Sequence, residues 1–421
     1  KTRVLTHRVT WLVGVEGLSP HSILAVTFTN KAASEMRHRT EALLGMQGAA
    51  LWIGTFHGIA HRLLRLHWRE ANLPQSFQIL DGDDQLRLIK KILKAQNLDE
   101  TRWVPRDVQY FINHHKDEGL RPKGLKDGND PTRRQLIKLY QDYEEACQRA
   151  GVVDFAELLL RAFELWRDNP ELLGHYRRRF RHVLVDEFQD TNNVQYAFIR
   201  LLAGERGQVF VVGDDDQSIY GWRGAQVGNM QKFLDDYPGA RTIRLEQNYR
   251  STNTILKAAN AVIRQNTRRR EKSLWSAKGD GSKITLYAFD TDETEGRTVV
   301  ENIEYDRLTR QIPWGKQAIL FRTNIQSRPI EAALRKARVR YRLIGGQSFF
   351  DRSEIKDILA YLKTFVNPND DVNLLRIANK PARGLSDVTM ERLLAFSAER
   401  QASVYTVMRH TDVLGSFQAR T

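Results

Sequence analysis

Cysteine and long apolar runs are nearly absent from this 421-residue chain. Its single cysteine, Cys147, excludes an intrachain disulfide and indicates a reducing compartment. No apolar stretch approaches the roughly 20 residues of a membrane-spanning helix, and no signal peptide is present at the amino end. We therefore expect a cytoplasmic protein without a membrane partner.

An initiator methionine and a glycine-rich loop are also absent from the amino end. The chain opens on Lys1-Thr2-Arg3. A Lys-Thr pair closes the phosphate-binding pattern G-x-x-x-x-G-K-[ST], in which the lysine reaches the phosphates and the hydroxyl binds Mg²⁺. We expect the sequence to be a fragment that begins inside such a loop and continues beyond Thr421.

The composition indicates a folded chain with an excess of positive charge. It is 41% hydrophobic and 28% charged, and its length predicts two to four structural units. The net charge is +14 and the pI is near 9.8. Because aromatic residues are interleaved with the basic ones, a nucleic acid is a better polyanionic partner than a membrane.

Strand and helix signals alternate in two parts of the chain, and helical spacing fills the remainder. This alternation predicts an α/β fold with parallel sheets, interrupted by mostly helical insertions. The predicted strands are residues 23–28, 51–56, 182–185, 208–212, 242–246, 283–288 and 317–322.

The run Val-Leu-Val-Asp-Glu-Phe-Gln-Asp, residues 183–190, contains the strongest chemical signal. Ligands of doubly wound sheets bind beyond the carboxyl ends of the strands, where Asp186 and Glu187 would lie. An aspartate there can hold the Mg²⁺ of a nucleotide, and the next glutamate can take a proton from the attacking water. The alternative is an acidic pair that ends a strand in a solvated turn.

A second apolar strand leads into Asp214-Asp215-Asp216-Gln217. The acids are typical of a turn, whereas Gln217 could contact a γ-phosphate and orient water. The loop that follows contains Tyr220, Trp222 and Arg223, a combination that can stack on unpaired bases. The alternative is a plug of buried aromatic side chains.

Other strand ends supply further candidates. Arg250 could act as an arginine finger and Tyr249 could stack on adenine, although an arginine capping a surface turn is the alternative. Hydroxyl, aromatic and imidazole groups at two earlier strand ends could contact nucleic-acid phosphates. These residues are Phe28, Thr29, Asn30, Thr55 and His57.

The segments TFTNKAASEMR, GTFHG, VDEFQD, GDDDQSIYGWRGA and LEQNYRS occur in this order. They resemble the motifs of superfamily 1 DNA helicases of the UvrD/Rep/PcrA group, and the resemblance extends over essentially the whole chain. It implies two RecA-like motor domains of the P-loop NTPase class. It also implies ATP and Mg²⁺ as cofactors, 3′→5′ movement on single-stranded DNA and duplex unwinding in nucleotide excision repair, mismatch repair, replication and recombination.

The resemblance also implies domain limits and residue roles. The implied segments are 1–70 and 181–246 for the first motor domain, 71–180 for its insertion, 247–343 for the second motor domain and 344–421 for the start of its insertion. The implied ATP-site residues are Lys1, Thr2, Arg3, Asp186, Glu187, Gln217, Tyr249 and Arg250, with Thr2 and Asp186 on Mg²⁺. The implied DNA contacts are Phe28, Thr29, Asn30, Thr55, His57, Tyr220, Trp222, Arg223, Arg322, Asn324, Arg383 and Gly384.

The implied partners are single-stranded DNA, junctions between single- and double-stranded DNA, and DNA repair proteins. Self-association on DNA and a place in the bacterial cytosol or nucleoid are further expectations. Two alternatives stay open: the motor subunit of a helicase–nuclease, and a DNA-binding adaptor with an inactive ATP cleft. Because the phosphate-loop glycines and later motifs are missing, we expect this chain alone to be inactive.

Overall fold

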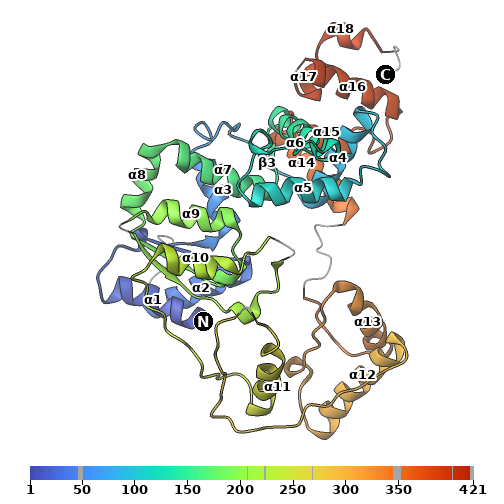
Figure 1. Ribbon diagram of the computed structural model, residues 1–421. Coiled ribbons are helices and arrows are strands. Elements are labelled where there is room, and N and C mark those ends of the chain that lie inside the picture. The colour runs from blue at the N-terminus through green and yellow to red at the C-terminus, as the bar shows by residue number, and fades with distance from the viewer. Residues whose placement is uncertain are drawn as a thin grey trace. The chain divides into compact units, whose positions relative to one another are not determined.

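The computed structural model describes residues 1–45, 51–205, 207–221, 224–267, 269–344, 352–400 and 402–417 (Figure 1). The chain divides into two compact units. The first comprises Lys1–Leu245, Gln265–Lys272 and Ala360–Thr421, and the second comprises Glu246–Arg264 and Ser273–Leu359. None of the described helices is long and apolar enough to cross a membrane.

A four-stranded parallel sheet forms the centre of the first unit, with strand order β2-β1-β5-β6. Its strands are β1 (Ile23–Thr27), β2 (Trp52–Thr55), β5 (His182–Val185) and β6 (Gln208–Val211). In the register, Leu24 of β1 lies opposite Trp52 of β2 and Val183 of β5. The sequence prediction of a parallel sheet from these four apolar runs is confirmed.

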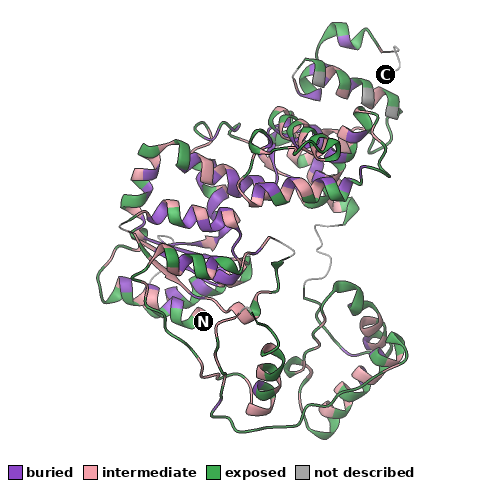
Figure 2. Ribbon diagram, viewed as in Figure 1, coloured by how far each residue is buried: buried purple, intermediate pink, exposed green. Residues whose placement is uncertain are grey.

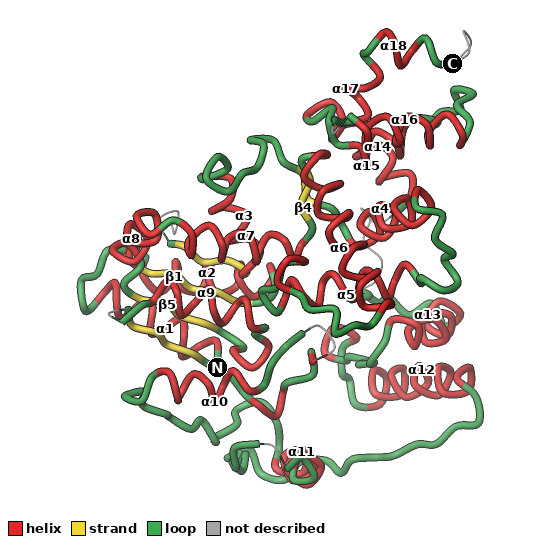
Figure 3. The backbone as a smooth tube through the Cα atoms, turned by 45° about the horizontal axis from the view of Figure 1, so that its top comes forward, coloured by secondary structure: helices red, strands yellow, loops and turns green. Residues whose placement is uncertain are grey.

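Helices cover both faces of this sheet because successive strand side chains point in opposite directions (Figure 3). Ile23, Ala25 and Leu184 pack with the helices of one face, which are α1 (Thr2–Gly14) and α2 (Asn30–Leu44). Leu24 and Val183 belong to the core on the other face. The helices that contribute to that core include α3 (Phe56–Leu66), α7 (Phe155–Asp168) and α9 (Asn193–Ala203). All of β1 and most of β5 are accordingly buried, whereas the edge strand β6 is only partly buried (Figure 2).

Helices dominate the remainder of the first unit, as the helical spacing predicted. Ile89, Ile112 and Tyr140 come from three different helices and share a separate buried core. A short parallel pair, β3 (Gln78–Ile79) and β4 (Val152–Val153), borders this core. The helices are α4 (Gly82–Ala95), α5 (Pro105–Asp117), α6 (Pro131–Ala150), α8 (Pro170–Arg179), α10 (Gly228–Asp236), α15 (Asp371–Ile377), α16 (Asp387–Glu399), α17 (Val404–Met408) and α18 (Thr411–Leu414).

The second unit contains α11 (Asn253–Ile263), α12 (Asp292–Thr309) and α13 (Ser327–Lys336), and α14 (Ser353–Val366) begins in it. Val300 of α12 and Leu334 of α13 share a small buried cluster.

The predicted strands at residues 242–246, 283–288 and 317–322 are wrong, because no strand covers them in the described chain. A strand requires a hydrogen-bonded neighbour as well as β propensity, and several apolar side chains of these segments are exposed. Leu286 and Leu320 are 93% and 92% exposed.

A buried ion cluster joins α5 to α7 within the first unit. Lys116 is 2% exposed, and its Nζ lies 2.7 Å from Asp154 and 3.0 Å from Glu157. The Tyr143 hydroxyl donates a hydrogen bond to Asp154 at 2.8 Å. Removing one member of such a cluster leaves a buried charge without compensation.

We predict that Lys116→Met lowers the free energy of unfolding by about 3 kcal/mol, because Asp154 would stay buried without its cation. Glu157 would keep its ion pairs with Arg121 and Arg161. Denaturant unfolding followed by circular dichroism measures the effect. The exposed Lys138 on α6 provides the control Lys138→Met, which should leave stability nearly unchanged. Equal effects of the two substitutions would contradict the prediction.

The end of α5 contacts the start of α9 through Asp117, a half-buried acid. The Asp117 carboxylate accepts a hydrogen bond from the Asn192 amide at 2.8 Å. Burial, with smaller contributions from Asp154 and Glu118, raises the pKa of Asp117 to about 7. The folded protein therefore favours the protonated form of Asp117, and stability decreases as pH rises from the ordinary aspartate pKa through 7.

We predict that Asp117→Asn stabilises the protein relative to wild type as pH rises from 5 to 8, because the variant has no proton to lose. The difference in unfolding free energy should grow by at most about 1.4 kcal/mol per pH unit. Thermal or denaturant unfolding across this pH range measures it, with Asp107→Asn, an exposed site on the same helix, as control. A difference independent of pH would contradict the prediction.

Candidate functional site

Side chains predicted to bind nucleotide gather at the carboxyl ends of β5 and β6. The Thr2 hydroxyl donates a hydrogen bond to Asp186 Oδ2 at 3.0 Å. Lys1 Nζ forms an ion pair with Glu187 and donates to Gln217 Oε1 at 3.3 Å. Residues distant in sequence are thus brought together because β5 and β6 are adjacent parallel strands that end at the same edge.

Asp186 is the most buried acid of this site, at 1% exposure. Its Oδ1 has no hydrogen-bond partner among the described residues, although Oδ2 is held by Thr2. Burial raises the pKa of Asp186, and the Thr2 hydrogen bond partly offsets this. Buried polar atoms normally have partners, and a hydroxyl beside a carboxylate suits Mg²⁺. Thr2 and Asp186 therefore fit the metal that the family implies.

Glu187 has a left-handed backbone, with φ of +49°, which is uncommon for a residue with a side chain. Backbone hydrogen bonds on either side hold this conformation: Phe188 N–H donates to Val212 O, and Asp190 N–H donates to Glu187 O, both at 2.9 Å. The sharp turn follows β5 directly and begins the 3₁₀ helix Phe188–Asp190. It presents the Glu187 carboxylate to Lys1.

Gln189 and Asp190 are site residues that sequence analysis missed. Gln189 Nε2 donates to Glu187 Oε2 at 3.1 Å, and its Oε1 accepts from the Asp214 N–H at 2.9 Å, so this amide links the two strand ends. Asp190 Oδ1 is buried without a partner among the described residues. Burial, followed by the charge of Glu187, raises the pKa of Asp190 to about 6. Their position inside the VDEFQD run was the available signal.

Gln217 ends the 3₁₀ helix Asp215–Gln217 that follows β6. Its Nε2 donates to Asp214 Oδ2 at 2.6 Å, and Asp214 Oδ1 accepts from the Asp216 N–H at 3.2 Å. The prediction of turn chemistry for the acids is confirmed. Asp214 also holds the amide group of Gln217, which the sequence did not indicate.

The candidate DNA contacts at the ends of β1 and β2 have defined local roles. Thr29 and Thr55 accept hydrogen bonds from N–H groups in the first turns of α2 and α3, at 3.1 and 3.0 Å. Phe28 packs against Phe56, with ring centroids 5.5 Å apart, and Asn30 is exposed at the start of α2. Burial lowers the pKa of His57 to about 4. His57 is therefore neutral at pH 7 and offers a hydrogen bond without a charge.

The remaining candidates of the first unit are spread over separate segments. Tyr220 is 38% exposed, whereas Trp222 and Arg223 lie outside the described residues. The Arg383 guanidinium donates to the Ile377 and Lys380 carbonyls at 2.6 and 3.1 Å. The next residue, Gly384, has φ of +73°, and Arg3 Nε lies 3.4 Å from a ring nitrogen of His7.

Four candidates belong to the second unit. Tyr249 is 74% exposed, and its hydroxyl donates to Gln247 at 2.8 Å. The Arg250 side chain is exposed. The Arg322 N–H donates to Gln326 Oε1 at 2.9 Å, and Asn324 begins the 3₁₀ helix Asn324–Gln326. Their roles stay predictions.

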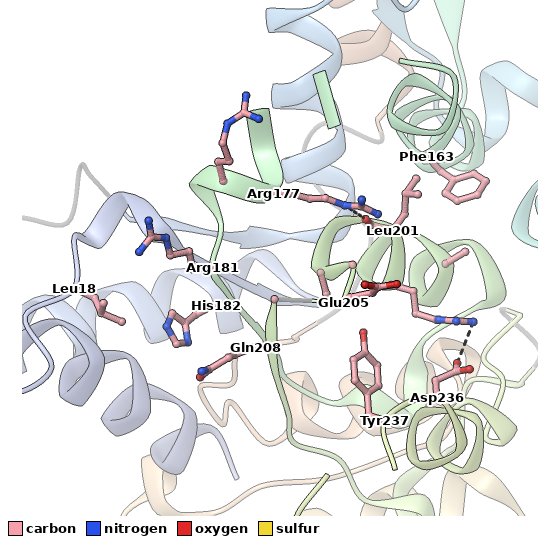
Figure 4. A pocket seen from close by; sticks show the side chains of 16 residues that line it. Leu18, Phe163, Arg177, Arg181, His182, Leu201, Glu205, Gln208, Asp236 and Tyr237 are labelled. Carbon is pink, nitrogen blue, oxygen red and sulfur yellow. Dashed lines mark hydrogen bonds and ion pairs between the residues drawn. The ribbon is translucent and has the colours of Figure 1, made fainter. Parts of the chain in front are cut away.

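A cavity of about 1550 Å³ lies at the opposite edge of the sheet (Figure 4). Its lining includes His182 and Gln208, the first residues of β5 and β6. The Arg177 Nε donates to the Leu201 carbonyl at 2.9 Å within this cavity. Because Asp186 follows the other end of β5, the cavity is separate from the predicted nucleotide site.

Comparison with known proteins identifies the family. Residues 1–238 match the model of the UvrD/REP helicase N-terminal domain, and residues 243–413 match that of the UvrD-like helicase C-terminal domain. DNA helicase II of Escherichia coli is 56% identical over 412 residues, which cover 97% of this chain and 57% of that protein. DNA helicase II of Haemophilus influenzae is 51% identical over 97% of this chain and 56% of its own length.

The ATP-dependent DNA helicase PcrA of Staphylococcus epidermidis is 41% identical over 417 residues, covering 99% of this chain and 57% of the relative. The chain thus spans a little over half the length of these curated relatives. Since the N-terminal helicase model alone matches more than half of the chain, the protein belongs to the UvrD/REP helicase family.

Proposed function

We propose that the chain carries the ATP-hydrolysing core of a DNA helicase that moves 3′→5′ along single-stranded DNA and unwinds duplex DNA. The observation that carries this proposal is the convergence of Lys1, Thr2, Asp186, Glu187 and Gln217 at one edge of the sheet. The relatives named as DNA helicases support the same assignment.

The side chains suit Mg²⁺-dependent hydrolysis of ATP. Thr2 and Asp186 would hold the ion, which neutralises phosphate charge when bound. Lys1 would leave Glu187 for the ATP phosphates, because phosphate carries more negative charge than one carboxylate. The freed Glu187 carboxylate could then accept a proton from water as its oxygen bonds to the γ-phosphorus and the bond to ADP breaks.

Gln217 would connect nucleotide chemistry to DNA binding. Its Oε1 already lies near Lys1, at 3.3 Å from Nζ, so it can hydrogen-bond to water or to a group beside the phosphate. Only two residues separate Gln217 from Tyr220, which would stack on a base. Arg250 and Tyr249 would contribute an arginine finger and a stacking ring on adenine, as the family resemblance implies.

The basic composition supports a DNA partner. The net charge of +14 favours a polyanion, and single strands and their junctions with duplex are the proposed substrates. The DNA contacts that the resemblance implies in both units, from Phe28 to Gly384, are proposed with this substrate. Action in excision repair, mismatch repair, replication and recombination, contacts with repair proteins and self-association on DNA belong to the same proposal.

We predict that Glu187→Gln abolishes ATP hydrolysis by the full-length protein, lowering kcat at least about 100-fold, because an amide cannot take the proton. Nucleotide binding should persist, since Lys1, Thr2 and Asp186 are unchanged. Phosphate release and binding of a fluorescent ATP analogue measure the two properties.

The matched control is Glu145→Gln, an exposed glutamate on α6 that accepts a hydrogen bond from Gln141. It should hydrolyse ATP like wild type. Normal turnover by the Glu187→Gln variant would show that Glu187 is not the base that accepts the proton from water. A wild-type protein that binds DNA and never hydrolyses ATP would favour the adaptor alternative.

A further inference from the structure

The acidic turn after β6 is held by a basic segment from much later in the chain. Asp214, Asp215 and Asp216 all accept hydrogen bonds from residues 269–272, which belong to the first unit. We call Arg269, Arg270 and Lys272 the basic clasp.

The contacts of the basic clasp are specific. Arg269 donates twice to the Asp216 carboxylate, at 2.8 and 2.9 Å, in the bidentate geometry that makes arginine–carboxylate pairs strong. Lys272 Nζ pairs with Asp214 and lies 3.1 Å from Asp216. The Arg270 N–H donates to Asp215 at 3.3 Å, and its guanidinium donates to the Met230 carbonyl at 3.0 Å.

These pairs are largely shielded from water. The Arg269 and Asp216 side chains are 8% and 13% exposed, and those of Lys272 and Asp214 are 18% and 14% exposed. Burial alone would raise the pKa of Asp216, yet hydrogen bonds from Arg269 and Lys272 hold it below its ordinary value. Shielded pairs with several hydrogen bonds resist solvent screening better than surface pairs do.

The same carboxylate that binds Lys272 orients Gln217. Asp214 Oδ1 accepts from Lys272 while Oδ2 accepts from Gln217 Nε2 at 2.6 Å. Because an ionised carboxylate only accepts hydrogen bonds, it selects the NH₂ end of the amide. The Oε1 end is therefore left toward Lys1, 3.3 Å from its Nζ.

We propose that Arg269 and Lys272 are positioning residues for Gln217, acting through Asp216 and Asp214. This inference rests on the proposed ATPase function and adds residues that the family motifs quoted above do not contain. The clasp fixes both the backbone turn and the amide orientation, so that Oε1 faces the phosphate side of the site before nucleotide arrives.

The basic clasp lies in a short segment of the first unit, Gln265–Lys272, that interrupts the second unit in the sequence. The residues on either side, Arg264 and Ser273, belong to the second unit. The covalent chain therefore connects the segment that contains the clasp to the second unit at both of its ends.

The first test is ATP hydrolysis by the full-length protein with saturating single-stranded DNA. Lys272→Met should lower kcat about tenfold and leave KM for ATP within about twofold, because a misplaced amide weakens the chemical step more than ATP binding. Lys272→Arg should restore most of the rate. The control Lys257→Met removes a surface pair with Asp280, whose side chains are 74% and 69% exposed, and should behave like wild type.

A double-mutant cycle isolates the coupling between Lys272 and Asp214. Asp214→Asn should reproduce the Lys272→Met defect, and the double variant should be no worse than either single one. Additive losses, or a Lys272→Met enzyme with wild-type kcat, would overturn the proposal.

Hydrogen exchange separates this inference from the proposed function, since it needs no hydrolysis. The N–H groups of Asp214, Asp216, Gln217 and Ser218 are hydrogen-bonded within the first unit. Lys272→Met and Arg269→Gln should increase exchange in this turn, whereas Lys257→Met should not. Unchanged exchange would overturn the clasp even in an inactive protein. Faster exchange in these two variants, combined with a wild type that lacks ATPase activity, would support the clasp and reject the proposed function.

Discussion

The site depends on the burial of the Asp186 carboxylate, which has only one hydrogen-bond partner among the described residues. One oxygen is held by Thr2, and the other has no partner among the described residues. Burying an ionised acid whose oxygen has no partner is unfavourable unless a cation binds that oxygen. The sheet nevertheless holds it there, because β5 lies between β1 and β6 and is covered by helices on both faces.

A series of ion pairs and hydrogen bonds connects Glu187, beside this acid, to Lys272. Lys1 pairs with Glu187 and contacts Gln217, Gln217 binds Asp214, and Asp214 pairs with Lys272. Each link therefore brings an accepting group to a donating one. Because most of these contacts join segments distant in sequence, exchange of one partner for a phosphate would affect the others. This connectivity is the physical basis of the coupling that we propose between nucleotide state and the loop after Gln217.

The sequence predicted the first sheet because its strands are short apolar runs that find parallel neighbours in the same unit. It failed for residues 283–288 and 317–322, where similar runs have no strand partner and leave Leu286 and Leu320 exposed. Local propensity favours an extended backbone in both cases, but hydrogen-bonded partners decide whether a strand forms. The acids and amide at the strand ends were identifiable because parallel strands bring their carboxyl ends together.

The supporting residues were harder to predict. Gln189 links two strand ends through its amide, and Lys272 reaches an aspartate 58 positions earlier in the chain. Neither contact leaves a periodic signal, and the place of Gln189 in the VDEFQD run does not identify its partner. The opposite charges of residues 214–216 and 269–272 were visible, but charge complementarity alone does not select one pairing among many in a chain with 65 basic and 51 acidic residues.

The most direct measurement is the rate of ATP hydrolysis by the full-length protein, with and without single-stranded DNA, at low and high salt. The proposed coupling through Gln217 predicts strong stimulation by DNA that is lost at high salt, because phosphate contacts release counterions. Hydrolysis that is indifferent to DNA at low salt would contradict the link from Gln217 to the DNA-binding loop.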